Sequence, residues 1–451
     1  MNYFGTDGIR GTYDDALINA RFLKRVGYAI GSYLKEFLHI AHPKVAIGRD
    51  PRTSGEELEK ALVEGLRYWN VQCFMLGVVP TPVVSFACNK NPQADLGIMI
   101  TASHNPFNDN GIKLFKSSGE KLSVAEEKEI ENFIDRFPTY PAAKEDLKND
   151  RKNYDALKPY KQFIVSLCPK NFLKKKKFLI DTANGATTYT ASEILTSLGA
   201  EVISMGDEPD GVNINDKVGS EHPQLLAKSC SKRAVPLGFA FDGDGDRVVF
   251  CDENSKIVDG DQILGLLALH YLRTKKLKNN TLVATIHSNM GLDNAIKEAG
   301  GTVFRTQVGD RNVYYSMKEQ GSNLGGESSG HVIFGDIKNT GDGLLTLLQV
   351  LMVMEKTQKR LADLRTEITL YPQVNLSLKV AEKKPLECMS ELQEFLAMAE
   401  KELGNQGRVL VRYSGTENKI RLLSECENPQ QAFAILRRIE KIVHKELSII
   451  G

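Results

Sequence analysis

Three aspartates stand close together in the segment Asp242-Gly-Asp-Gly-Asp-Arg247. They follow the apolar run 237–241, so the carboxylates gather just beyond a predicted strand end, where α/β folds place their ligands. Carboxylates at every second position can face the same way, and the glycines between them permit a tight path around an ion. A hard cation bound through oxygen relieves the repulsion among them, and Mg²⁺ suits a site that leaves positions open for phosphate oxygens.

Two other interpretations of this acidic segment have to be weighed. A calcium loop of the EF-hand type would place its ligands at positions one, three, five and twelve, where the three aspartates and Glu253 stand. Its sixth position must be glycine, however, and here it is Arg247, while 248–251 has the pattern of a strand. We reject the calcium loop and keep a solvated acidic turn as the alternative to a magnesium site.

A second segment, Thr101-Ala-Ser-His-Asn-Pro106, follows the strand-like run 96–100 and presents Ser103 at a strand end. His104 stands beside Ser103, and Lys113 comes later in the same segment. A serine hydroxyl is a weak nucleophile without a base or a metal. The chain has neither a G-x-S-x-G elbow nor a P-loop around this serine. A serine that carries phosphate beside Mg²⁺ needs neither, although a plain Ser/Asn/Pro turn explains the segment equally well in isolation.

Two glycine-containing segments complete the set. In Gly325-Gly-Glu-Ser-Ser-Gly-His331, a carboxylate flanked by hydroxyls suits vicinal sugar hydroxyls, and the histidine can manage protons, although a flexible turn is the alternative. In Arg412-Tyr-Ser-Gly-Thr-Glu-Asn418, followed by Arg421, two guanidinium groups and two hydroxyls form a good phosphate cradle. An ordinary Ser-Gly turn with surface arginines is the alternative there. Together the four segments fit a substrate that is phosphorylated at one end and reacts at the other.

The elements that position these segments repeat along the chain. An apolar strand, a polar or glycine turn, a helix and a returning strand follow one another in 44–76, again in 177–204 and again in 281–304. Strands that alternate with helices predict mixed or parallel α/β sheets. We therefore expect three related α/β domains over 1–153, 154–253 and 254–368. A smaller C-terminal α+β domain over 369–451 has a strand at 408–411 and an amphipathic helix at 430–446.

The bulk composition limits the function classes. The 451 residues include 58 Lys+Arg and 57 Asp+Glu, and this near-neutral balance argues against nucleic acid or a membrane surface as the partner. The seven cysteines are scattered and never paired as C-x-x-C, which is typical of a reducing cytosol. No secretory signal is visible, and the apolar stretch 344–354 is too short to span a bilayer, so it predicts a buried helix. We expect a cytoplasmic protein.

In these four segments, in this order, the chain resembles the α-D-phosphohexomutase family from Tyr3 to about Leu423. Within that family, Phe4-Gly-Thr-Asp-Gly-Ile-Arg-Gly11, the match over 101–115 and Val308-Gly-Asp-Arg311 look most like the phosphoglucosamine mutase branch. The resemblance implies four domains around a central cleft. It also implies interconversion of glucosamine 6-phosphate and glucosamine 1-phosphate through a phosphoserine and a 1,6-bisphosphate, in the supply of UDP-N-acetylglucosamine for cell-wall synthesis.

The resemblance assigns roles to individual residues. Ser103 would be the phosphorylated serine, and Mg²⁺ would be bound by that phosphoserine with Asp242, Asp244 and Asp246. Glu327 and Ser329 would contact the sugar. The non-reacting phosphate would be held by Arg412, Ser414, Gly415, Thr416 and Arg421, and the reacting end would be assisted by Arg10, His104, Lys113, Arg247 and His331. Two departures concern the substrate: Ser328 stands where this branch commonly has Gln, and Asn418 replaces the usual Pro.

The implied cofactors are Mg²⁺ and a priming bisphosphate, glucosamine 1,6-bisphosphate or glucose 1,6-bisphosphate. The partner is a small sugar phosphate, while a homodimer and a kinase that first phosphorylates Ser103 stay open. The main alternative is the same reaction on glucose or mannose phosphates. A catalytically silent sugar-phosphate sensor and a metal phosphatase are alternatives of other classes.

Overall fold

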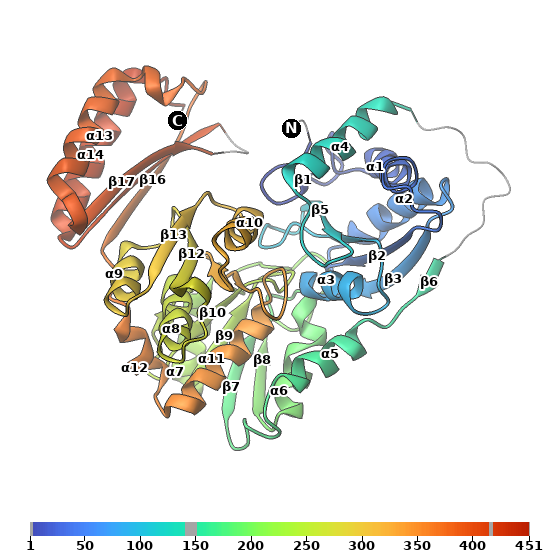
Figure 1. The fold of residues 1–451 in the computed structure, drawn as a ribbon, viewed down its shortest axis with the longest axis horizontal. Helices are drawn as coiled ribbons and strands as arrows, with labels where there is room; N and C mark the ends of the chain where they lie inside the picture. The colour runs from blue at the N-terminus through green and yellow to red at the C-terminus, as the bar shows by residue number, and fades with distance from the viewer. Residues whose placement is uncertain (1–2, 140–150, 415–417, 451) are drawn as a thin grey trace. The chain divides into compact units, whose positions relative to one another are not determined.

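The computed structural model describes residues 3–139, 151–414 and 418–450 (Figure 1). The chain divides into two units. The first takes its residues from 1–287 and 299–367, and the second from 288–298 and 368–451. The described strands form four sheets, of which three mixed sheets belong to the first unit and one antiparallel sheet to the second.

The first sheet has the strand order β1-β5-β4-β2-β3-β6. Its strands are β1 (Ile9–Thr12), β2 (Lys44–Arg49), β3 (Gln72–Val78), β4 (Leu96–Ile100), β5 (Asp109–Lys116) and β6 (Arg151–Asn153). β2 runs parallel to β3 and β4, and β5 runs antiparallel to β4 and β1. The helices are α1 (Ala20–Ser32), α2 (Gly55–Arg67), α3 (Thr81–Asn89) and α4 (Val124–Arg136). Every residue of β4 is buried, because α2 and α3 both pack against this strand.

The second sheet has the order β11-β10-β9-β7-β8. Its strands are β7 (Lys177–Asp181), β8 (Glu201–Met205), β9 (Leu237–Phe241), β10 (Val248–Cys251) and β11 (Ile257–Val258), with helices α5 (Leu157–Ser166), α6 (Ala191–Ser197) and α7 (Pro223–Arg233). β7 is parallel to β8 and β9, whereas β10 is antiparallel to β9. β9 is wholly buried, which explains why its sequence is an unbroken apolar run.

The third sheet has the order β13-β12-β14-β15. Its strands are β12 (Thr281–Thr285), β13 (Thr302–Thr306), β14 (Leu324–Gly326) and β15 (Val332–Phe334), with helices α8 (Gly260–Arg273), α10 (Asp310–Gln320), α11 (Gly343–Thr357) and α12 (Leu361–Leu364). The predicted helix at 344–354 lies on α11, whose apolar side chains are mostly buried. β14 and β15 are antiparallel and are joined by the loop that carries the Gly-Glu-Ser-Ser-Gly segment.

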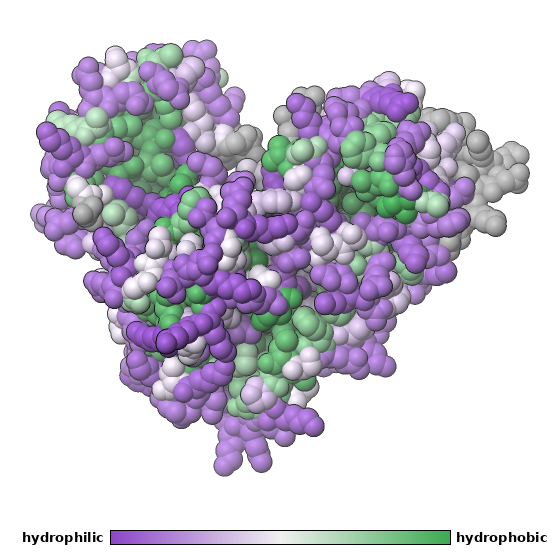
Figure 2. All heavy atoms as spheres, viewed as in Figure 1, coloured by the Kyte–Doolittle hydropathy of each residue, from purple (hydrophilic) through white to green (hydrophobic). Residues whose placement is uncertain are grey.

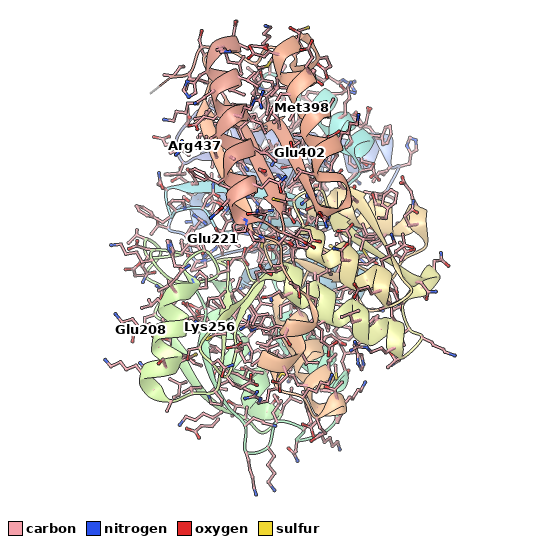
Figure 3. The ribbon with its side chains drawn as sticks, turned by 90° about the vertical axis from the view of Figure 1, so that its left-hand side faces the viewer. Glu208, Glu221, Lys256, Met398, Glu402 and Arg437 are labelled. Atoms are coloured by element: carbon pink, nitrogen blue, oxygen red, sulfur yellow. The ribbon has the colours of Figure 1, made fainter. Side chains whose placement is uncertain are left out.

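The C-terminal unit is an antiparallel sheet of order β16-β18-β17 with helices on one side. Its elements are α9 (Met290–Glu298), β16 (Gln373–Lys379), α13 (Ser390–Leu403), β17 (Gly407–Tyr413), β18 (Lys419–Cys426) and α14 (Pro429–Glu446). Met398 and Glu402 on α13 and Arg437 on α14 mark the helical layer (Figure 3). The predicted strand at 408–411 and the helix at 430–446 are confirmed. Short π or 3₁₀ segments occupy Tyr33–Phe37, Ala186–Tyr189, Lys278–Asn280, Arg365–Glu367, Leu386–Cys388 and Gly404–Gln406.

The predicted fold class is confirmed: three mixed α/β domains precede a smaller α+β domain. The domain boundaries and the central cleft stay predictions. The face drawn in Figure 2 is mostly hydrophilic, with smaller apolar areas between. No helix in the described ranges is long and apolar enough to cross a membrane.

Candidate active site

Three loops that follow strand ends meet in the first unit. Ser103 lies just beyond β4, Asp242 directly follows β9, and Glu327 directly follows β14. Because the carboxyl ends of the strands in α/β sheets are where loops converge on ligands, these positions are suited to a site. The structure links the loops across domains, since Ser103 bonds to Asp242 and Arg247 forms an isolated antiparallel bridge with His331.

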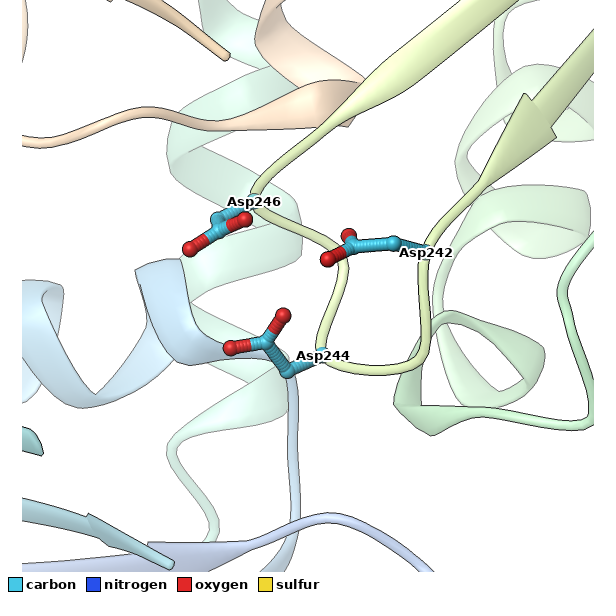
Figure 4. A group of neighbouring side chains, drawn as sticks. All are labelled: Asp242, Asp244 and Asp246. Atoms are coloured by element: carbon cyan, nitrogen blue, oxygen red, sulfur yellow. The ribbon is translucent and has the colours of Figure 1, made fainter. Parts of the chain in front are cut away.

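The three aspartates point toward one another from the loop between β9 and β10 (Figure 4). One carboxylate oxygen from each lies within 4.8 Å of the others, and all three residues are buried. Asp244 Oδ1 and Asp246 Oδ1 are buried without a hydrogen-bond donor. Buried carboxylate oxygens that accept no hydrogen bond are costly unless a cation satisfies them. The donor set is all oxygen and small, so it fits Mg²⁺.

The pKa values of the aspartates in this loop are shifted in opposite directions. Burial, together with the carboxylates of Asp244 and Asp246, raises the pKa of Asp242 well above its ordinary value. Burial acts in the same direction on Asp246, but the charges of Lys113 and His331 outweigh it and hold the pKa of Asp246 well below its usual range. Lys113 Nζ lies 2.8 Å from Asp244 and 2.9 Å from Asp246, so its ammonium group balances part of the negative charge. A divalent cation would favour the ionised form of all three aspartates.

Ser103 is directed at this acidic loop. Its Oγ donates to Asp242 Oδ2 over 2.7 Å, and the residue is fully buried. Its φ of +54° lies in the left-handed region, which is unusual for a serine. The Ser103 N–H donates to Thr101 Oγ1 over 2.8 Å, so the side chain two residues earlier helps to hold this conformation. A phosphate on Ser103 would therefore lie against the aspartates.

Basic side chains surround the same point. Arg247 donates its N–H to Asp242 Oδ1 over 3.1 Å, and its Nη1 lies 3.0 Å from His104 Nδ1. Arg10 is paired with Asp7. Arg10 Nε and Arg247 Nε are buried and have no acceptor. Unsatisfied guanidinium donors of this kind are what a phosphate group would complete.

The two histidines of the prediction differ in their surroundings. Burial, with the positive charges of Arg247 and Arg10, lowers the pKa of His104 to about 3, so its imidazole is neutral. His331 Nδ1 lies 3.6 Å from Asp246 Oδ1, and its Nε2 lies 3.6 Å from Asp310 Oδ2. Burial lowers the pKa of His331, but these carboxylates outweigh that effect and raise it above its ordinary value.

The loop between β14 and β15 is held by bonds to β10 and to Gly309. The N–H of Val248 donates to the carbonyl of Gly330 over 3.3 Å, and Glu327 Oε1 accepts the N–H of Gly309 over 3.0 Å. Glu327 is buried, and Ser329 Oγ is buried without a partner. A carboxylate and an unsatisfied hydroxyl on one constrained loop are suited to sugar hydroxyls.

The predicted phosphate cradle belongs to the C-terminal unit. Arg412 on β17 is the direct cross-strand partner of Arg421 on β18. Burial and the charge of Arg421 lower the pKa of Arg412. Ser414 donates its N–H to the carbonyl of Lys419 over 2.8 Å. Gly415 and Thr416 lie outside the described residues, and the place of the cradle relative to Ser103 stays a prediction.

Sequence reasoning missed an ionic group next to the aspartates. Lys121 pairs with Asp7 and, over 2.5 Å, with Asp310, and Lys113 lies 3.3 Å from Asp7. Asp7 and Asp310 lie within two segments that had already been singled out, 4–11 and 308–311, so their positions in those segments could have indicated them. Thr81 was also missed; its Oγ1 donates to Asp244 Oδ2 over 2.5 Å.

A second missed group lies behind Ser103. The side chains of Asp50, Arg52, Thr101 and Asn215 are buried against its loop. Asp50 and Arg52 come immediately after β2, which is the same kind of strand-end position that drew attention to Ser103. Nothing in the sequence around Asn215 marks it, because its partners are main-chain oxygens far away in the chain.

Comparison with known protein families matches four consecutive models. Residues 1–140, 158–256 and 259–371 match the models described as phosphoglucomutase/phosphomannomutase, alpha/beta/alpha domains I, II and III. Residues 376–442 match the C-terminal domain model of the same family. The matches run in the order of the domains described above.

Similar curated proteins include the phosphoglucosamine mutase of Thermodesulfovibrio yellowstonii, 41% identical over 99% of this chain and 100% of that protein. The phosphoglucosamine mutase of Zymomonas mobilis is 42% identical over 98% of this chain and 99% of its own length. Among solved structures, a phosphoglucomutase/phosphomannomutase family protein from Burkholderia thailandensis has a TM-score of 0.81 at 25% identity, covering 99% of this chain and 98% of its own. The Aspergillus fumigatus N-acetylphosphoglucosamine mutase, solved with GlcNAc-6P and magnesium, shares the fold with a TM-score of 0.65 at 16% identity, over 98% of this chain and 95% of its own.

Proposed function

The chain belongs to the phosphoglucomutase/phosphomannomutase family, and on that premise we propose that it acts as a phosphoglucosamine mutase. It interconverts glucosamine 6-phosphate and glucosamine 1-phosphate, and so supplies UDP-N-acetylglucosamine and cell-wall synthesis. The observation that carries the proposal is the buried Ser103 hydroxyl, 2.7 Å from Asp242 within the group of three aspartates. The full-length similarity to phosphoglucosamine mutases supports the choice of an amino-sugar substrate.

The aspartates Asp242, Asp244 and Asp246, with a phosphate oxygen on Ser103, would hold Mg²⁺. When bound, the ion supplies charge neutralisation for the oxygens of the phosphoryl group. The buried carboxylate oxygens without donors support this assignment. Lys113 and Arg247 add positive charge at the same point, and phosphoryl transfer depends mainly on such positioning and electrostatic stabilisation.

In the first half-reaction, phospho-Ser103 donates its phosphoryl group to the free hydroxyl at C1 of glucosamine 6-phosphate. The bond from phosphorus to Ser103 Oγ breaks, the bond to the sugar oxygen forms, the sugar hydroxyl loses a proton and Oγ gains one. The product is glucosamine 1,6-bisphosphate. It turns over, and its 6-phosphate then returns to Ser103, which releases glucosamine 1-phosphate.

We assign the proton transfer at the sugar to His331. It lies on the same loop as Glu327 and Ser329, the residues proposed to contact the sugar hydroxyls. A positioned acid or base of this kind contributes about 10²–10⁴-fold to the rate. His104 Nδ1 lies 3.0 Å from Arg247 Nη1, and we assign His104 to hold that guanidinium group. His331 in turn accepts the N–H of Gly341 at Nε2 over 3.1 Å and faces Asp246 with Nδ1. Arg10 and Arg247 would bind the reacting phosphate through their unsatisfied Nε groups.

The second phosphate would be bound by the cradle of the C-terminal domain, which includes Arg412, Ser414, Gly415, Thr416 and Arg421. Two arginines on directly opposite strand positions can offer two guanidinium forks to one phosphate dianion. A cytoplasmic location, a homodimer, a kinase that primes Ser103 and glucose 1,6-bisphosphate as an alternative primer stay predictions.

The test is a mutase assay with Mg²⁺ and a priming bisphosphate across glucosamine, glucose and mannose 6-phosphates, with mass spectrometry of Ser103. We expect the highest kcat/KM for glucosamine 6-phosphate and a phosphate on Ser103. Faster turnover of a hexose phosphate would assign the chain to phosphoglucomutase or phosphomannomutase chemistry. Steady release of inorganic phosphate would indicate a phosphatase, and an unmodified, inactive protein would indicate a sensor.

A further inference from the structure

The guanidinium group of Arg52 is buried directly behind the Ser103 loop. Arg52 is 1% exposed, and a guanidinium group carries five N–H donors. All five are used: Nε donates to Asp50 Oδ2 over 2.9 Å, Nη1 to the carbonyls of Asp109 over 2.9 Å and of Pro106, and Nη2 to the carbonyls of Asn105 over 2.8 Å and of Ser103 over 3.0 Å. Four of the five acceptors are thus main-chain oxygens of residues 103–109, that is, of the loop after β4 and the first residue of β5.

Asn215 reaches the same loop from the second α/β domain. Its Nδ2 donates to the carbonyl of Ser103 over 2.9 Å and to the carbonyl of Asn105 over 3.0 Å. Each of these two carbonyls therefore accepts one bond from Arg52 and one from Asn215. Arg52 belongs to the first α/β domain and Asn215 to the second. We call Arg52 and Asn215, with the carbonyls they share, the carbonyl clamp.

The loop needs such restraint because of its backbone. Ser103 has a φ of +54°, and a left-handed residue other than glycine costs about 1–2 kcal/mol relative to ordinary conformations. On the N–H side it is held by Thr101 Oγ1, which itself donates to Asp50 Oδ2 over 2.6 Å. The Ser103 carbonyl oxygen is held by the clamp. Within residues 3–139, 151–414 and 418–450, its described hydrogen bonds come only from Arg52 and Asn215.

The clamp also contacts the metal loop. A Cβ added to Gly243 would lie 2.7 Å from the Ser103 carbonyl oxygen and 2.8 Å from Asn215 Nδ2. The backbone between Asp242 and Asp244 therefore packs directly on the shared carbonyl, and only glycine fits there. The separation of the Ser103 hydroxyl from Asp242, 2.7 Å, consequently depends on where the clamp holds that carbonyl.

We propose that Arg52 and Asn215 are positioning residues for phosphoryl transfer. They hold the strained Ser103 backbone so that Oγ stays aligned on the aspartate loop while the sugar end of the substrate changes. Asn215 connects two domains: it lies in the second α/β domain, and its hydrogen bonds fix the loop of the nucleophile, Ser103, which lies in the first. The proposal rests on the proposed function, since it concerns the transfer step at Ser103.

The experiment measures the transfer from phospho-Ser103 to glucosamine 6-phosphate in a single turnover by rapid quench, along with steady-state kcat and KM, for wild type and Asn215→Ala. A displacement of about 1 Å at a reacting group costs on the order of 10²-fold in rate, and we expect a loss of that size in the transfer rate and in kcat, with KM unchanged. Substitution of a residue that merely stabilises the fold would lower the unfolding midpoint but would not lower the transfer rate and kcat at unchanged KM.

Asn323→Ala is the matched control. Asn323 is a buried asparagine of the same unit, and its Nδ2 donates to the carbonyl of Lys276 over 3.0 Å and to Asp336 Oδ2 over 2.7 Å. We expect Asn323→Ala to lower the unfolding midpoint by a similar amount and to keep the wild-type transfer rate. Asn215→Asp, which keeps the shape but loses the donors, should reproduce the loss and carries the test if Asn215→Ala does not fold.

Arg52→Lys tests the other half of the clamp. A lysine keeps the positive charge but has three donors on a single nitrogen, so it cannot serve four carbonyls and a carboxylate. We expect a slower transfer step with KM unchanged. A wild-type transfer rate in both Asn215 variants would overturn the clamp while the proposed function stands. A wild-type protein without phosphate on Ser103 and without turnover would overturn the proposed function itself.

Discussion

Replacement of Lys113 by methionine tests whether the aspartate loop, whose three carboxylates are buried, binds a divalent cation. Lys113 is 1% exposed, and its ammonium group lies 2.8 Å from Asp244, 2.9 Å from Asp246 and 3.3 Å from Asp7. Methionine keeps most of the side-chain volume, so the change removes mainly the charge. The carboxylates are then left buried with less compensation.

The expected cost is large without a divalent cation. Breaking a buried ion pair by removing one partner destabilises a protein by about 3–5 kcal/mol, because the remaining charge stays in a poorly solvated position. Mg²⁺ among the aspartates would replace the lost positive charge. A ligand that binds only the folded state adds about 2.7 kcal/mol of stability at one hundred times its Kd. We therefore expect Mg²⁺ to stabilise Lys113→Met more than wild type, since no ammonium group then neutralises the same carboxylates.

The assay is thermal unfolding of wild type and Lys113→Met in EDTA and over a Mg²⁺ titration. The matched control is Lys338→Met, because Lys338 is also a buried lysine, paired with Asp342 over 2.9 Å. That variant should lose stability in EDTA and regain no more with Mg²⁺ than wild type does. Equal Mg²⁺ shifts in all three proteins, or no shift in any, would refute the placement of the ion on these carboxylates.

Three further substitutions test other parts of the site. Ser103→Ala should lose turnover and phosphate incorporation, and turnover at the wild-type level would contradict a phosphoserine. Arg421→Ala should raise the KM for the sugar phosphate, because it removes one of the two guanidinium groups on facing strand positions that would hold the non-reacting phosphate. An unchanged KM would remove the cradle from the substrate site. Gly330→Ala should weaken sugar binding, because Gly330 has a φ of +88° and an added Cβ would lie 2.3 Å from the Val248 carbonyl oxygen. If the variant keeps the wild-type KM and unfolding midpoint, the contact of this loop with Val248 is not needed.

Much of the fold could be predicted because its signals are local. The buried strands β4 and β9 are unbroken apolar runs, and each ends at a polar or glycine-rich segment, so the strand and the loop that carries the chemistry were both visible. The helices α11 and α14 showed as long apolar or amphipathic segments. The segment 288–298, by contrast, belongs with the C-terminal unit although it follows β12 directly in the chain. No local pattern indicates such an assignment.

The candidate site divides in the same way. Asp242, Asp244 and Asp246 could be grouped from spacing alone, because they lie within one turn and must be near one another. Their connection to Ser103 was inferred from the combination of segments and from the resemblance, and the roles of these residues stay proposals. Lys121 and Asn215 could not be found, because each acts on partners that are distant in the sequence, such as the Ser103 carbonyl 112 positions before Asn215.

The sequence by itself determined which residue types were available for phosphate chemistry, and it determined that they would stand at strand ends, since strand and turn signals depend on neighbours along the chain. Only the tertiary structure decided that Ser103 Oγ lies 2.7 Å from Asp242, 139 positions later, and that Arg52 and Asn215 share the carbonyl behind it. The physical reason is that crossovers and the packing of three sheets bring these groups together. The short-range hydrogen bonds that orient them form only after the sheets are in place.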